Sequence, residues 1–166
     1  MMETQAQPAP GALVRTIDVA TSADVAFALL CEVEKWPVWL SFLRSVRRVG
    51  TAPLGLGSEV ELRSSIPGDE EQLFEVDRYI QGHAISLVGA YSIRRRIDVR
   101  VEAKSSVVRV TVRIDYPAYG GALGALYDRM TTRRKLEAAL GDSLLHFKGL
   151  VEYGGTGSKD ALLEDL

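Results

Sequence analysis

Apolar and polar residues alternate along several stretches of this chain, and turn-forming residues separate the stretches. In SVVRVTVRIDY, residues 106–116, apolar side chains occupy every second position, and charged residues or threonine stand between them. Side chains of a strand point alternately to the two faces of a sheet, so this pattern is typical of an antiparallel sheet with one face in water. The stretches predicted as strands are residues 13–20, 57–66, 71–80, 83–91, 92–104 and 106–116.

Two short helices are predicted after the first strand. Residues 25–36 repeat apolar side chains at helical spacing and follow Ser22, a residue type that caps helices. Pro37 either ends this helix or starts a second one, because proline cannot donate a hydrogen bond inside a helix. We expect the second helix to continue through Leu40 and Leu43.

A long amphipathic helix is predicted from Gly121 to about Tyr153, where two glycines follow. A sheet with one apolar face and a helix with one apolar stripe must bury these surfaces against each other. We therefore expect an α+β fold in which a curved antiparallel sheet wraps around the last helix. The apolar stripe of the helix comprises Leu123, Leu126, Tyr127, Met130, Leu140, Leu144, Phe147 and Val151.

The chain is expected to form one domain with loose ends. Residues 1–11 are rich in proline, glutamine and alanine and predict a flexible arm, and residues 154–166 begin with a glycine-rich stretch and predict a flexible tail. The domain itself should span residues 12–153. We find no internal repeat and no change of composition within it.

Charge and composition narrow the classes of partner. The 166 residues carry 20 Lys and Arg against 22 Asp and Glu, so there is no positive excess to neutralise the phosphates of a nucleic acid. We expect no signal peptide in the first residues, and no apolar run approaches the roughly 20 residues of a membrane span. A single cysteine, Cys31, excludes an intramolecular disulfide. We expect a cytoplasmic monomer or homodimer.

Two segments together resemble the START-like superfamily, also called SRPBCC, which includes polyketide cyclase and lipid-transport families. They are TIDVATSADVAFALLCEVEKWPVWLSFLRSV, residues 16–46, and YPAYGGALGALYDRMTTRRKLEAALGDSLLHFKGLVEY, residues 116–153. The resemblance lies in their order and spacing over nearly the whole structured unit. It implies a helix-grip fold, in which the sheet and the C-terminal helix enclose a hydrophobic cavity.

The resemblance also implies what the cavity does. Members bind lipids, sterols, quinones or aromatic polyketides there, and a minority catalyse reactions. We expect a binding or carrier protein for an apolar small molecule, with no cofactor and no metal. The alternative is a polyketide cyclase or aromatase. Aromatase-type members place a tyrosine after the Trp-Pro turn and an arginine late in a central strand, and these positions correspond here to Leu43 and Arg78. A third hypothesis is a protein partner bound at the rim.

The two tryptophans of the chain flank Pro37, close to the expected entrance of the cavity. Either both are buried and anchor a corner of the core, or one is a core residue and the other faces the opening. We expect Trp36 to be the core residue and Trp39 to face the opening.

Two arginines are predicted on the inward faces of their strands. Counting by twos from Phe74 gives Arg78, and counting back by two from Ile97 gives Arg95. Either guanidinium group could sit at a strand end and reach water, or it could bind a carboxylate, carbonyl or phenolate at one end of a ligand. We expect at least one to reach the cavity. A β-bulge between Phe74 and Arg78, or between Arg95 and Ile97, would reverse this parity.

Other polar residues complete the set of candidates. Tyr116 and Tyr127 offer hydroxyl groups on otherwise apolar faces, whereas His83 and His146 lack the neighbours of a metal site or a catalytic triad. Cys31 is expected to be a buried, inert thiol. The residues predicted to line the cavity are Trp39, Leu43, Leu62, Phe74, Val76, Arg78, Leu87, Arg95, Ile97, Val110, Tyr116, Tyr127, Met130 and Leu140.

Overall fold

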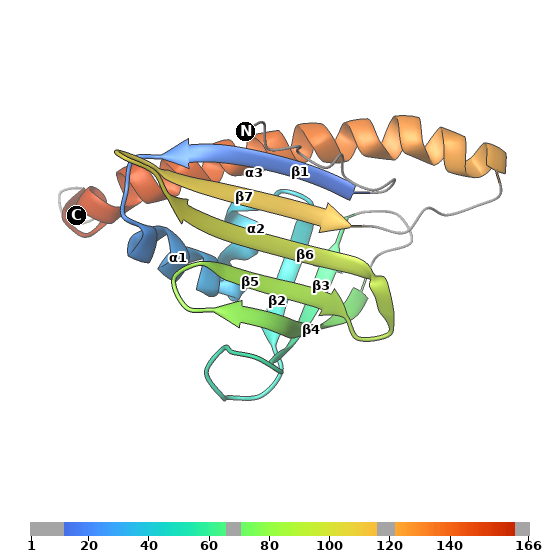
Figure 1. Ribbon diagram of the computed structural model, residues 1–166, viewed down its shortest axis with the longest axis horizontal. Helices are drawn as coiled ribbons and strands as arrows, with labels where there is room; N and C mark the ends of the chain where they lie inside the picture. Colours follow the sequence, from blue (N-terminus) through green and yellow to red (C-terminus); the bar gives the residue numbers. More distant parts are fainter. Residues whose placement is uncertain (1–11, 66–70, 116–121, 162–166) are drawn as a thin grey trace, which may run out of the picture.

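A single antiparallel sheet dominates the computed structural model of the protein. In the described part of the chain, seven strands lie in the order β1-β7-β6-β5-β4-β3-β2 (Figure 1). They are β1 (Ala12–Val19), β2 (Leu43–Arg48), β3 (Glu59–Ser64), β4 (Glu71–Ile80), β5 (Ala84–Gly89), β6 (Ser92–Ala103) and β7 (Val108–Asp115). The structure describes residues 12–65, 71–115 and 122–161, and the side chains of these except 92–94, 122–132 and 154–161.

The alternation read from the sequence corresponds to the two faces of this sheet. In β7 every second residue from Val108 to Ile114 is buried, and the residues between them are partly exposed. Their cross-strand partners lie on the same face of the sheet, as in the pair of Val99 with Val112. The prediction of an antiparallel sheet with one apolar face is therefore confirmed.

Helices occupy the concave side and one end of the sheet. Ser22 caps the first of them, because its Oγ accepts a hydrogen bond from the Val25 N–H at 3.3 Å. Pro37 stands in the first turn of α2, where a missing N–H removes no helical hydrogen bond. The helices are α1 (Ala23–Cys31), the 3-10 turn η1 (Val33–Lys35), α2 (Trp36–Trp39) and α3 (Ala122–Ala161).

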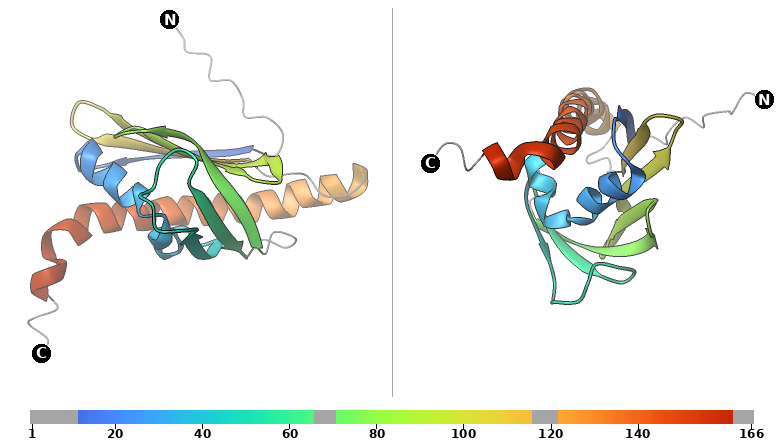
Figure 2. Two further views of the ribbon diagram at one scale, coloured as in Figure 1. Left: turned by 90° about the horizontal axis from the view of Figure 1, so that it is seen from below. Right: turned by 90° about the vertical axis from the view of Figure 1, so that its left-hand side faces the viewer.

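The sheet curls, and α3 lies along its open side (Figure 2). The helix packs mainly against β1 and also meets α1 and α2. Buried residues of α3, such as Leu140 and Phe147, belong to the same core as Val99 and Val110 of the concave sheet face. This is the predicted helix-grip arrangement.

Polar contacts join α3 to the neighbouring elements. Lys148 donates to the backbone carbonyl of Asp18 at 2.8 Å, and Glu152 accepts from the Ala20 N–H at 2.8 Å. Farther up the helix, the buried Ser143 hydroxyl accepts from the Ser41 N–H at 3.0 Å. These bonds hold the helix in register with β1 and with the loop that follows α2.

The second helix is shorter than predicted, and a strand follows it. α2 ends at Trp39, and Leu43 begins β2, which the sequence pattern did not reveal. The register of β2 shifts between Leu43 and Ser45, so Leu43 and Val46 are both buried although they are three residues apart. Leu40 and Leu43 are likewise both buried and three residues apart, but Leu40 caps the end of α2 and Leu43 begins a strand, which explains the wrong prediction.

Two further helix expectations need correction. Val25 is 49% exposed, so the buried face of α1 is formed by Ala26, Phe27 and Leu30. The long helix does not end near Tyr153 but continues to Ala161. Glycine in a helix costs only about 1 kcal/mol relative to alanine, so the glycines after Tyr153 weaken the helix without forcing it to end. The flexibility of the tail stays a prediction.

Replacing Phe147 with alanine should lower the free energy of unfolding of the protein. Phe147 is fully buried, and its ring centroid lies 5.0 Å from that of Trp39. Removing a buried phenylalanine costs about 3–5 kcal/mol. Leu145→Ala is the matched control, because Leu145 is 61% exposed on the same helix and should change stability by less than about 0.5 kcal/mol. Urea denaturation followed by circular dichroism measures both, and equal losses would contradict the packing.

Stability should depend on the ionisation of Glu152. The Ala20 N–H, and then Lys148, lower the pKa of Glu152 below its ordinary value of 4.5. A lowered pKa stabilises the folded state above that ordinary value, and the effect is lost as the pH falls through the folded-state pKa. Glu152→Gln should therefore be less stable than the wild type at pH 7, and the difference should shrink in acid.

Urea midpoints between pH 3 and pH 8 test this dependence. Glu75→Gln is the control, since Glu75 is exposed and no ion pair within the described residues includes it. A constant difference between Glu152→Gln and the wild type over the whole pH range would contradict the role of the charge.

Candidate functional site

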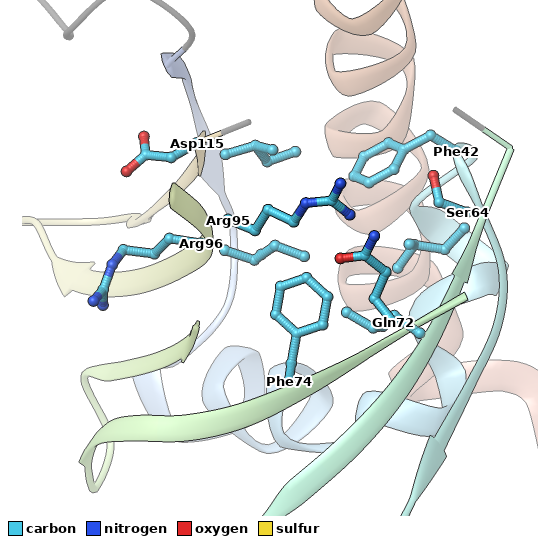
Figure 3. A pocket seen from close by; sticks show the side chains of 11 residues that line it. Phe42, Ser64, Gln72, Phe74, Arg95, Arg96 and Asp115 are labelled. Carbon is cyan, nitrogen blue, oxygen red and sulfur yellow. The ribbon is translucent and has the colours of Figure 1, made fainter. Parts of the chain in front are cut away.

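A pocket opens on the concave side where β3 and β7 end and β4 and β6 begin (Figure 3). Its wall is mostly apolar, and the polar side chains among the lining residues come from the ends of these strands. Among the described residues, the lining comprises Phe42, Leu43, Leu62, Ser64, Gln72, Phe74, Arg95, Arg96, Ile97, Ile114 and Asp115.

Strand register builds the apolar wall. Ile97 pairs with Ile114 across β6 and β7, and Phe74 pairs with Val60 across β4 and β3. Cross-strand partners share a face, so these residues all point to the concave side. Ile97, Ile114 and Phe74 are each 5% exposed, which shows that they belong to the edge of the core as well as to the pocket.

Arg95 points into this apolar setting. Figure 3 shows its side chain crossing the pocket toward Gln72 and Phe42, with Ser64 nearby. Burial lowers the pKa of the Arg95 guanidinium from its ordinary value, yet arginine stays charged in proteins. The pocket therefore contains a positive charge beside aliphatic and aromatic side chains.

The pocket is narrow in this conformation. The space that a water-sized molecule can reach is about 30 Å³, whereas the empty space that includes the open mouth is about 450 Å³. The inner space suits about one or two water molecules. A larger ligand must therefore displace side chains, and Arg95 and Gln72 are long enough to move.

Arg78 lies on the opposite face, so its predicted place in the cavity is wrong. The register of β4 shifts between Val76 and Arg78. Arg78 pairs with Ser86, which pairs in turn with Asp98 on the outer face, and the Arg78 side chain is exposed. The bulge turns Tyr79 inward in its place, against Phe27 at 5.8 Å between ring centroids.

The two other charged residues of the lining, Arg96 and Asp115, point away from the pocket. Arg96 donates to both carboxylate oxygens of Asp77 at 2.8 and 3.1 Å and to Ser86 at 2.7 Å. Asp115 accepts from Arg113 at 2.9 Å. Figure 3 shows Arg96 and Asp115 directed to the outer side of the sheet. Their charges therefore lie outside the pocket.

Both tryptophans are core residues, so the expectation that Trp39 faces an opening is wrong. Each is fully buried, and their rings meet edge to face at 6.2 Å. The Trp36 indole N–H donates to the Leu30 carbonyl at 2.9 Å. The Trp39 indole N–H is buried without a hydrogen-bond partner among the described residues. The ring of Phe147 packs edge to face against the ring of Trp39, with 5.0 Å between the centroids.

Apart from Arg78, the structure divides the predicted lining residues into three groups. Leu43, Leu62, Phe74, Arg95 and Ile97 line the pocket. Tyr116 lies outside the described residues, as do the side chains of Tyr127 and Met130. The residues buried in the core without lining this pocket are Trp39, Val76, Leu87, Val110 and Leu140.

Sequence reasoning missed four concave-side residues of the pocket. Gln72 and Ser64 occupy the inward parity of their strands, two residues from Phe74 and Leu62, so counting by twos would have found them. The alternation in residues 106–116 gives Ile114 an inward position but does not connect this residue with the cavity. Phe42 follows α2 in a loop, where no periodicity gives its direction.

A second hollow lies on the outer face of the sheet, with about 190 Å³ accessible to water. Val14, Asp98, Arg100, Thr111 and Arg113 line it. Charges of both signs surround it, and it is open to the solvent. It lacks the apolar walls that a site for an apolar ligand needs.

The described residues offer little for catalysis or metal binding. No group of three His, Cys, Asp or Glu side chains among them could hold a metal ion. The Cys31 Sγ lies 3.9 Å from the Tyr79 hydroxyl, which donates to Gln81 at 2.8 Å. Burial raises the pKa of the Cys31 thiol, so less of it is present as the nucleophilic thiolate.

A family model described as "Polyketide cyclase / dehydrase and lipid transport" matches residues 11–152, which include the sheet, the pocket and most of α3. The chain belongs to this family. Membership agrees with the START-like resemblance of the two sequence segments. Within the residues that the structure describes, no helix has the length and the apolar character needed to cross a membrane.

Curated relatives share only part of the chain. Uncharacterised proteins of Mycobacterium tuberculosis and Mycobacterium bovis are 33% identical over 67 residues, which is 39% of this chain and 40% of theirs. The match thus spans well under half of their length.

Solved structures share the fold. A START superfamily protein of Mycobacterium smegmatis has a TM-score of 0.57 at 15% identity, over 84% of this chain and 96% of its own. The di-domain ARO/CYC StfQ of the steffimycin biosynthetic pathway has a TM-score of 0.61 at 16% identity, over 85% and 50%. The Aha1 dimer of Colwellia psychrerythraea has a TM-score of 0.60 at 14% identity, over 86% and 97%.

The thiol of Cys31 should react slowly with iodoacetamide. Because burial raises its pKa, the midpoint of the rate against pH should lie higher for the folded protein than for the same protein in urea. Tyr79→Phe should raise the midpoint further, since the Tyr79 hydroxyl partly lowers this pKa. Mass spectrometry of the alkylated protein measures the rate. Equal midpoints in the folded and unfolded protein would contradict the burial.

Proposed function

We propose that this protein binds an apolar small molecule in the concave pocket, as a binding or carrier protein. The observation that carries the proposal is the construction of the pocket. Its inner wall is apolar, and its polar concave-side residues, Ser64, Gln72 and Arg95, come from strand ends. Pockets for small molecules in proteins typically combine such an apolar wall with a few placed polar groups.

The family supports this function at the level of a class. Its description joins polyketide cyclases and dehydrases with lipid transport, and lipids are apolar ligands. The aromatase alternative drew its support from Arg78, but this side chain is exposed on the outer face. We therefore propose binding and do not propose a cyclase reaction.

A neutral fluorescent probe tests the proposal. N-phenyl-1-naphthylamine, excited beyond the absorption of tryptophan, should become brighter in a saturable, one-to-one manner when it enters the pocket. Gln72→Trp should fill the pocket from a partly exposed position and weaken binding by about tenfold or more, which corresponds to about 1.4 kcal/mol. The indole ring would occupy space that the probe needs.

Glu75→Trp is the matched control for this experiment. Glu75 lies on the same strand but points to the outer face, so the same ring added there should leave the affinity unchanged. Absence of saturable binding to the wild type would contradict the proposed function. Equal weakening by both substitutions would place the probe outside the concave pocket.

A further inference from the structure

We infer that the ligand of the concave pocket is an amphiphilic acid, whose anionic end lies at the mouth beside Arg95, Gln72 and Ser64 and whose apolar part points inward. This inference rests on the proposed function and adds the chemical class and the orientation of the ligand. It also assigns ligand-recognition roles to Gln72 and Ser64, alongside Arg95.

The three polar residues lie at or near the ends of three strands. Ser64 is the last residue of β3, Gln72 is the second of β4, and Arg95 lies near the start of β6. On each strand the next residue of the same face is apolar and lies about 7 Å farther in. These inner residues are Leu62, Phe74 and Ile97, and all three also line the pocket.

These three polar residues offer several hydrogen-bond donors. A guanidinium group only donates, whereas an amide and a hydroxyl group can each donate or accept. Figure 3 shows Arg95 and Gln72 directed toward each other, with Ser64 beside them. Ser64 is 7% exposed, so a ligand at this position would be largely shielded from water. A carboxylate has two acceptor oxygens and suits such a set of donors.

The charge of the lining also favours an anion. Asp115 is the one acidic residue among the described residues of the lining, and it points away from the pocket toward Arg113. Arg95 contributes a positive charge to this lining, in surroundings less polar than water. Electrostatic attraction is stronger in such surroundings than in water.

Two probes of equal chain length separate the head group from the tail. Octanoate and 1-octanol have the same apolar chain, but octanoate is ionised at pH 7. Isothermal titration calorimetry of the wild type should show octanoate binding about 10- to 100-fold more tightly, as expected for hydrogen bonds between charged groups. Arg95→Met should abolish this preference and leave the affinity for 1-octanol unchanged.

Two further variants serve as controls for this test. Arg78→Met removes the same charge from the outer face of the sheet and should preserve the preference for octanoate. Gln72→Leu should reduce the preference by a smaller factor, and this test does not depend on the folding of the Arg95 variant. Equal affinity of the wild type for both probes would overturn the inference, and so would equal losses in the Arg78 and Arg95 variants.

The outcome for the neutral probes separates this inference from the proposed function. If 1-octanol and N-phenyl-1-naphthylamine bind to the pocket but octanoate has no advantage, the acid specificity is wrong and the binding function stands. If none of the three compounds binds, the proposed function fails together with the inference.

Discussion

The packing of α3 against the curled sheet is the interaction on which the rest of the molecule depends. Phe147 of the helix meets Trp39 of α2, and both join the buried valines of the central strands. The short helices fill one end of the concave face, and α3 closes its open side (Figure 2). The end where β3 and β7 finish remains less filled, and the pocket lies there.

A single extra residue in β4 decides on which face of the sheet Arg78 lies. The bulge in β4 sends Arg78 to the outer face, whereas Arg95 lines the pocket although the register between β5 and β6 shifts beside it, between Arg96 and Ser92. A one-residue change in parity exchanges the two faces of a strand. The side chains that β4 presents on the concave face thus depend on one extra residue in this strand.

Arginines of the outer face have a different environment from Arg95. Arg96 and Arg109 each form a bidentate pair with an aspartate, Asp77 and Asp18 respectively. Such exposed pairs contribute little to stability individually, but they keep both charges solvated. Arg95 lines the concave pocket, where most of its neighbours in the lining are apolar and burial opposes its charge. An ionisable residue in such a position is a candidate for function rather than for stability.

The sequence by itself determined the strand alternation, the long helix and the family, because side-chain periodicity and segment order are local properties of the chain. It also placed Leu62, Phe74, Arg95 and Ile97 on the inward face. Only the tertiary structure decided the bulges, the burial of Trp39 and the meeting of Gln72 with Arg95. These features depend on strand register and sheet curvature, which arise from contacts between residues far apart in the sequence.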